Sequence, residues 1–199
     1  MPDPNDVAAY DALLAKVTIG AEAPRGQDRD QRLRHRVARA VRAREARIRS
    51  VLGDRVVRIE HTGSTSVPGL PAKPIDISLE VPDTTDEPAY VPDLEVAGYP
   101  LSIREPEWYE HRLFKGLDTN VNLHVFSAGC DEVDRMVLFR EHLRTNAADR
   151  EQYTTAKRAL AARDWKYVQQ YADAKSDVVR EVVARAEAAS AAEEGRSRR

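Results

Sequence analysis

The chain of 199 residues is long enough for one domain with a hydrophobic core. Hydrophobic residues make up 42% and charged residues 32% of it, the composition of a soluble globular protein, and the formal net charge of −2 argues against a whole-protein affinity for nucleic acid or membrane. No apolar run approaches the length of a membrane span and no secretory leader is recognisable, so a cytoplasmic location is expected. The single cysteine, Cys130, excludes an intramolecular disulfide and a thiolate metal cluster.

The first quarter of the chain is predicted to be helical. A short helix is expected at residues 7–16, with a connector up to residue 27, and apolar residues at near-helical spacing predict one long amphipathic helix over 28–52. Ten arginines between Arg25 and Arg49 run around this helix. They either contact nucleic-acid phosphates or form a solvated, salt-bridged surface, and the absence of interleaved aromatic residues favours the second interpretation.

Strand-forming and turn-forming segments alternate in the middle of the chain. Strands are predicted at 55–61, 74–81, 99–105, 110–116 and 120–128, with a short helix ending near Gly98. Three helices follow at 131–144, 149–163 and about 167–188, and residues 189–199 are expected to form a frayed tail. The predicted fold is therefore α+β (α/β type), with a small mixed β-sheet flanked by helices in one domain over 28–188 and a helical C-terminal part from 131.

The stretch HTGSTSVPGLPAK, residues 61–73, has the composition of a small, rigid, polar loop. Gly63 permits a positive φ or a close backbone approach, and Ser64, Thr65 and Ser66 add hydroxyl groups beside free N–H groups. If a helical turn begins after Gly63 and Ser64, these groups point at an anion such as phosphate, whose charge Lys73 would neutralise. A proline-rich structural crossover without a ligand is the alternative.

Asp76 is an acidic residue within the otherwise apolar strand that follows. Strand alternation places its side chain with Ser78 and Glu80, opposite Ile75 and Ile77. A carboxylate beside a phosphate-binding loop is where a magnesium ligand would lie. An aspartate on the solvent face of an edge strand is equally compatible with this pattern.

The segment IEHTGSTSVPGLPAKPIDI closely resembles the signature of the GrpB family, within the nucleotidyltransferase-fold superfamily. The segments NLHVF and FREHLRTNAADREQYTTAKRALA resemble later parts of the same family, and the similarity extends over about residues 51–184. The resemblance implies a nucleotidyltransferase-like core with a mixed sheet. In it, Gly63 and Ser64 would contact nucleotide phosphates, and Asp76 would be the first metal carboxylate.

The chain departs from the superfamily pattern at the second metal carboxylate. Active nucleotidyltransferases generally carry Asp-x-Asp or Asp-x-Glu on this strand, and here the second position is Ser78. Glu80 is a poor replacement because it lies roughly 13 Å from Asp76 along a strand, whereas two catalytic metals lie about 3.5–4 Å apart. Asn122 and His124, which share a face of the last strand, bring no formal negative charge. Magnesium is therefore expected to bind weakly, and together with a bound nucleotide.

Two histidines lie near predicted strand ends. His124 is a candidate acid–base residue, whereas a hydrogen-bonded structural role is expected for His61. Arg112, on the fourth predicted strand, is expected to be a solvated charge at the rim.

Two residue pairs on the C-terminal helices are spaced i, i+4 and so share a helix face: Arg140 with Arg144, and Tyr153 with Lys157. Together they are candidates for a cationic and aromatic wall over a nucleotide. Surface salt bridges to neighbouring acidic residues are the alternative.

These features lead to one expected function and one alternative. The chain is expected to bind a nucleotide or a related phosphorylated small molecule, with Asp76 and His124 as candidate catalytic residues and any nucleotidyl transfer weakened by the missing carboxylate. No nucleic-acid or membrane partner is expected. The alternative is a non-catalytic binding or scaffolding module of the same fold.

Overall fold

The computed structural model describes residues 27–70, 74–117, 120–163 and 168–197. The predicted helix at 7–16 and the candidate phosphate ligand Lys73 lie outside these ranges. The helices and strands are α2 (Gln27–Leu52), β1 (Arg58–Thr62), β2 (Ile75–Val81), α3 (Val91–Val96), β3 (Leu101–Glu105), β4 (His111–Lys115), β5 (Val121–Ser127), α4 (Asp131–Thr145), α5 (Ala147–Ala161) and α6 (Val168–Ser197), with 3-10 turns at Gly53–Arg55, Ser64–Ser66 and Glu87–Ala89.

The five strands form one mixed sheet in the order β1-β2-β5-β4-β3. Strands β2 and β5 are parallel, and the other neighbouring pairs are antiparallel. Because β2 pairs with both β1 and β5, it is an interior strand, and the alternative of Asp76 on an edge strand is wrong. The predicted mixed α+β architecture is confirmed.

One face of the sheet packs on α2 and α3 and forms the main core. Ile77, Leu79 and Val81 on β2 are at most 1% exposed and contact Leu123 and Val125 of β5 in one buried cluster. Helix α2 adds Ile48 and Leu52 to the cluster, and α3 adds Leu94. The alternation predicted for β2 is therefore confirmed, since its apolar residues all lie on this side.

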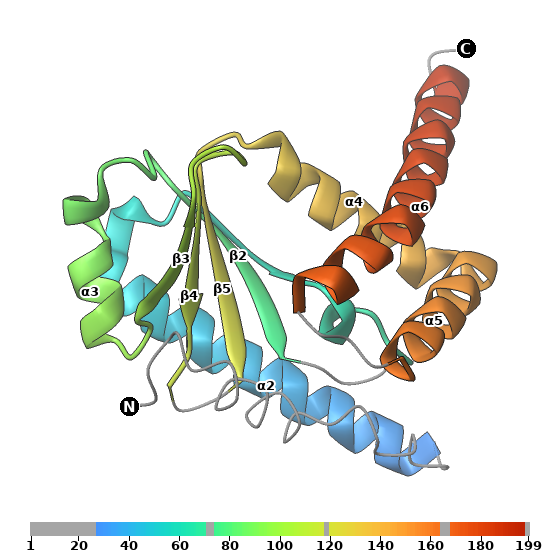
Figure 1. Cartoon of the computed structure of the whole chain (residues 1–199), viewed down its shortest axis with the longest axis horizontal. Coiled ribbons are helices and arrows are strands. Elements are labelled where there is room, and N and C mark those ends of the chain that lie inside the picture. The colour runs from blue at the N-terminus through green and yellow to red at the C-terminus, as the bar shows by residue number, and fades with distance from the viewer. Residues whose placement is uncertain (1–26, 71–73, 118–119, 164–167, 198–199) are drawn as a thin grey trace.

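Helices α4, α5 and α6 lie on the other side of the sheet from α3 (Figure 1). A second, smaller cluster holds them together, with buried Val67, Leu143, Tyr153 and Val182 at its centre. Val67 follows the loop after β1, so this cluster also attaches that loop to the C-terminal helices. The sheet face on this side carries polar residues, and it is here that the candidate site lies.

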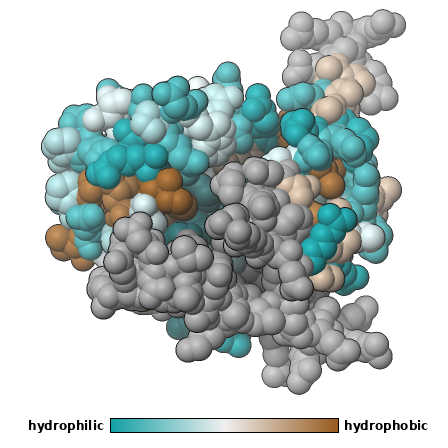
Figure 2. Space-filling model, viewed as in Figure 1, coloured by the Kyte–Doolittle hydropathy of each residue, from teal (hydrophilic) through white to brown (hydrophobic). Residues whose placement is uncertain are grey.

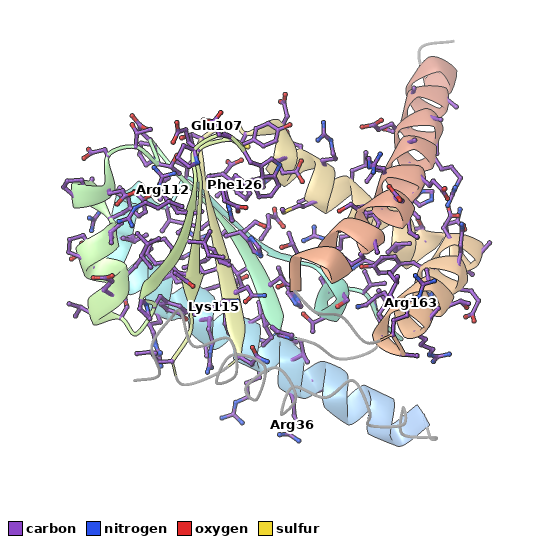
Figure 3. The ribbon with its side chains drawn as sticks, viewed as in Figure 1. Arg36, Glu107, Arg112, Lys115, Phe126 and Arg163 are labelled. Atoms are coloured by element: carbon purple, nitrogen blue, oxygen red, sulfur yellow. The ribbon has the colours of Figure 1, made fainter. Side chains whose placement is uncertain are left out.

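Two features differ from the sequence-based expectations. Helix α6 continues to Ser197, past its predicted end near residue 188, because the Ala- and Glu-rich segment has high helix propensity. Arg112 is 6% exposed and its Nε donates to Glu87 at 2.7 Å, so its prediction as a solvated rim charge is wrong. Figure 3 shows Arg112 on the α3 side of the strands and Phe126 on the opposite side.

In the described part of the chain, no helix combines the length and the apolar character that crossing a membrane requires. Figure 2 shows apolar surface gathered on the side where α3 and the edge of the sheet lie. Val96 of α3 is 88% exposed, and Ile103 of the edge strand β3 is 40% exposed.

Candidate functional site

The strand register brings four polar side chains into one row across the sheet. Thr62 of β1 pairs with Asp76, Asp76 pairs with Asn122 across the parallel β2–β5 ladder, and Asn122 pairs with Lys115 of β4. Residues paired in this way point to the same face. The row therefore presents a hydroxyl, a carboxylate, an amide and an ammonium on the side of α4 to α6.

Asp76 is the centre of this row. The Asn122 Nδ2 donates to Asp76 Oδ1 at 2.8 Å, and the Lys115 Nζ donates to Asn122 Oδ1 at 2.6 Å. Because an ammonium only donates, Lys115 determines which end of the Asn122 amide faces Asp76. His124, one row further along β5, places its Nε2 3.9 Å from Asp76 Oδ1.

Asp76 is recessed in the protein and still reached by solvent. Burial raises the pKa of Asp76, but the nearby His124, the hydrogen bond from Asn122 and the charge of Lys175 on α6 outweigh it, so the pKa lies below its ordinary value. Its side chain is 24% exposed, and that of His124 is 21% exposed. Asp76 is therefore an ionised carboxylate that is partly exposed to solvent.

Gly63 packs directly against this carboxylate. It has φ +64° and ψ −169°, a conformation that residues with a Cβ essentially do not adopt. A Cβ added at Gly63 would lie 2.1 Å from Asp76 Oδ2. The predicted positive φ and close approach are both present, and the group that approaches is the Asp76 side chain.

The serine and threonine residues after Gly63 form a short 3-10 turn, Ser64–Ser66. The Ser66 N–H and Oγ both donate to Gly63 O, so this amide is engaged within the turn. Ser64 and Ser66 are 6% and 4% exposed. Thr65 Oγ1 lies 2.9 Å from His61 Nε2. Burial lowers the pKa of His61 to about 4, helped by the charge of Arg144, which agrees with the structural role expected for it.

The two arginines of the predicted cationic wall bind the backbone on either side of Gly63. Arg140 Nη1 donates to His61 O at 2.8 Å and to a Glu60 carboxylate oxygen at 2.9 Å. Arg144 donates from Nε and Nη2 to Ser66 O at 3.0 and 2.7 Å. Both guanidinium groups therefore anchor this loop to α4.

Tyr153 and Lys157, the other pair of the predicted wall, lie in the helical core. Each is 4% exposed, and the Lys157 Nζ lies 5.5 Å from the centre of the Tyr153 ring. The Tyr153 ring packs edge-on against Phe139 of α4. Packing between α4 and α5 thus accounts for the position of the Tyr153 ring.

Ser78 is the residue at which the resemblance to nucleotidyltransferases would place a second metal carboxylate. It is fully buried, its Oγ lies 2.9 Å from Thr62 Oγ1, and it contacts Met136 Sδ of α4 at 3.2 Å. Across the described ranges, no three His, Cys, Asp or Glu residues are grouped so as to hold a metal ion. The residues present therefore do not fit a resident magnesium ion.

Three residues of this region were not identified as site residues from the sequence. Lys115 and His111 alternate with Arg112 and Phe114 on β4, so strand parity predicts that they share a face. Only the β4–β5 register, however, shows that this face is that of Asp76. Lys175 belongs to α6, and no local sequence signal relates it to Asp76.

The fold and this site define an α+β domain in which a parallel strand pair presents a carboxylate, an amide and an imidazole beside a glycine loop. The family model described as GrpB protein matches residues 31–185, and the chain belongs to the GrpB family.

Relatives with similar sequences include two bacterial proteins. The UPF0157 protein BH1888 of Halalkalibacterium halodurans is 61% identical over 147 residues, which cover 73% of this chain and 75% of that protein. The UPF0157 protein SCO7215 of Streptomyces coelicolor is 48% identical over 134 residues, or 67% of this chain and 70% of that one. The crystal structure of the conserved protein GrpB from Enterococcus faecalis is similar with a TM-score of 0.63 and 25% identity, covering 75% of this chain and 93% of that chain.

Proposed function

We propose that the protein binds a nucleotide or a related phosphorylated small molecule over the Asp76 row. The observation that carries this proposal is the positive charge around the partly exposed Asp76 carboxylate. Lys115 is joined to Asp76 through Asn122, and Lys175 is near enough to lower the pKa of Asp76, so two ammonium groups accompany one carboxylate. An anion is the ligand that this arrangement favours.

The GrpB resemblance points to a nucleotide as that anion, because it implies a nucleotidyltransferase-like core with Gly63 and Ser64 near the phosphates. Magnesium would arrive bound to those phosphates and contact Asp76. Any nucleotidyl transfer would be slow, because the position of the second carboxylate is a buried serine.

A non-catalytic binding module is the second candidate. The burial of Ser78 favours a binding module, since Thr62 and Met136 occupy the space that a second metal would need. Both candidates share the same ligand site and differ in whether the bound molecule reacts.

Isothermal titration with ATP, GTP and CTP, each with and without magnesium, tests the shared ligand site. Asp76→Asn should abolish the magnesium dependence and leave metal-free binding equal or stronger, because it removes a negative charge. Lys115→Gln should weaken binding roughly tenfold under both conditions. Arg158→Gln, which removes an exposed charge on α5, is the matched control and should change neither.

No heat with any of the three nucleotides in the wild-type protein would contradict the proposal. Release of labelled pyrophosphate separates the two candidates. Release that disappears in Asp76→Asn would establish transfer, and its absence in a protein that binds nucleotide would leave the binding module.

A further inference from the structure

A chain of hydrogen-bonding groups leads from the sheet edge into the candidate site. Glu105 of β3 pairs with His111 of β4, and its Oε2 lies 2.8 Å from His111 Nδ1. The other nitrogen of His111, Nε2, lies 3.1 Å from His124 Nδ1. His124 Nε2 then faces Asp76 Oδ1 at 3.9 Å. The chain thus runs from Glu105, which is 47% exposed, through buried His111 to the site floor.

The packing around His111 holds its ring in place. His111 is 2% exposed, with the Trp108 ring edge-on at 4.9 Å between centroids and the Phe126 ring at 4.8 Å. Its ring centroid lies 5.1 Å from that of His124, with the planes 25° apart, and the 3.1 Å between His111 Nε2 and His124 Nδ1 is within hydrogen-bond distance. The turn that carries Trp108 has two residues at positive φ, Tyr109 and Glu110, strain of the kind that persists only where the surrounding structure maintains it.

The donors and acceptors along this chain determine the proton positions. Burial, helped by the charge of Arg112, lowers the pKa of His111 to about 3, so its ring is neutral and carries one N–H. An ionised carboxylate only accepts, so His111 donates from Nδ1 to Glu105 and its Nε2 is an acceptor. His124 must then donate from Nδ1 to His111. In neutral His124, the remaining nitrogen, Nε2, carries a lone pair.

We propose that Glu105 and His111 are positioning residues that hold neutral His124 with its proton on Nδ1, so that the Nε2 lone pair faces the ligand site beside Asp76. Asp76 favours the opposite tautomer, but its oxygen is 3.9 Å from Nε2, whereas the His111 nitrogen is 3.1 Å from Nδ1. The shorter contact is within hydrogen-bond distance and the longer is not.

The role of this lone pair rests on the proposed function. An acceptor hydroxyl of a second substrate would give its proton to His124 Nε2 while its oxygen forms a bond to the α-phosphorus of a nucleoside triphosphate. The bond from that phosphorus to the pyrophosphate oxygen would break, and pyrophosphate would leave with the electron pair. His124 is the group that touches the reacting atom, and His111 acts through it.

The tautomer is measurable without any ligand, so its test does not depend on the proposed function. The chain has five histidines, and long-range proton–nitrogen NMR at about pH 9, well above the ordinary histidine pKa of about 6.5, distinguishes Nδ1–H from Nε2–H in each ring. The spectrum of His124→Gln identifies the signals of His124. We expect the wild-type His124 ring to carry its proton on Nδ1.

His111→Phe keeps an aromatic ring against Trp108 and Phe126 but removes the acceptor. It should shift the His124 tautomer ratio toward Nε2–H by about fivefold, the equivalent of one lost hydrogen bond. Trp108→Phe retains the acceptor and should leave the ratio unchanged. Glu105→Gln keeps an acceptor oxygen and should also leave the ratio unchanged. Glu105→Ala removes the acceptor and should shift the ratio in the same direction as His111→Phe. Because Glu105 is partly exposed, this variant tests the proposal even if His111→Phe does not fold.

Predominant Nε2–H on His124 in the wild-type protein would overturn the proposal. An unchanged His124 tautomer ratio in both His111→Phe and Glu105→Ala would overturn it equally, because a purely structural role of His111 moves stability and not the tautomer.

Discussion

Two features require a glycine at position 63: the positive φ of its backbone and the close approach of the Asp76 side chain. The Asp76 carboxylate fills the space that a side chain at position 63 would need, and the positive φ of Gly63 turns the chain away from β1. The role that the structure gives to this glycine is therefore to let the acidic side chain lie beside the loop.

Gly63→Ala should destabilise the protein by about 2–4 kcal/mol, because it adds both a disallowed backbone conformation and a clash with Asp76. Gly53→Ala is the matched control: Gly53 also has a positive φ, +55°, but a Cβ there meets nothing within 4 Å. It should cost about 1–2 kcal/mol. Urea unfolding measures both, and equal losses in the two variants would show that Asp76 does not crowd Gly63.

Ser78→Asp tests whether the missing carboxylate can be restored by one substitution. The position is fully buried between Thr62 and Met136, so an ionised side chain there lacks both solvent and a partner cation. We expect a loss of roughly 3–5 kcal/mol that magnesium does not recover, against about 1 kcal/mol for Ser78→Ala. Thermal unfolding with and without magnesium measures this, and a magnesium-dependent rise in Tm specific to Ser78→Asp would refute the sealed position.

At the scale of elements, one buried carboxylate joins the three C-terminal helices. Asp149 of α5 is 7% exposed, lies 2.5 Å from His142 Nε2 of α4 and accepts from Arg185 Nε of α6 at 2.9 Å. Burial raises the pKa of Asp149, but the hydrogen bonds from Arg185 and His142 outweigh it and lower the pKa overall. The ionised form therefore stabilises the packing of α4, α5 and α6.

The stabilisation by Asp149 should depend on pH. Because its pKa is lower in the folded than in the unfolded protein, its contribution is complete above the unfolded value of about 4 and is lost as pH falls through the folded value. Asp149→Asn should cost about 1–3 kcal/mol at pH 7, and the difference from wild type should shrink at acidic pH. Urea unfolding at a series of pH values measures the difference, and a constant difference down to about pH 2 would contradict this account.

Elements could be predicted from the sequence where periodicity carried the information. The alternation of Ile77, Leu79 and Val81 with polar residues identified β2 and its buried face, and helical spacing located α2 almost to the residue. The face shared by Asn122 and His124 was also predicted. These predictions depend on local patterns, which a single segment contains.

Contacts between segments could not be predicted in the same way. That His111 meets His124, or that Arg112 meets Glu87, depends on strand order and register, which no segment contains by itself. The i, i+4 spacing of Tyr153 and Lys157 is compatible with a ligand wall, because spacing does not show which helix covers that face. In the structure α4 lies over the Tyr153 ring, and both residues are buried.

At the scale of the whole molecule, the sheet separates two differently built layers. The α2 and α3 face is an apolar core, whereas the opposite face carries the Asp76 row, where the Asp76 and His124 side chains are 24% and 21% exposed. Lys115 lies toward the end of the strands opposite Phe126 (Figure 3), so the lysine and the aromatic support of His111 lie at different ends of this polar face. His124 lies beside Asp76, and under the proposed function it would contact the ligand.

The most direct test of this account is a crystal structure of the protein soaked with a nucleoside triphosphate and manganese, with anomalous scattering to locate the metal. We predict phosphate oxygens within hydrogen-bond distance of Lys115 and a manganese ion joining those phosphates to Asp76. A nucleotide bound elsewhere, or a site that stays empty at saturating nucleotide, would contradict the central claim that the Asp76 row binds a phosphorylated ligand.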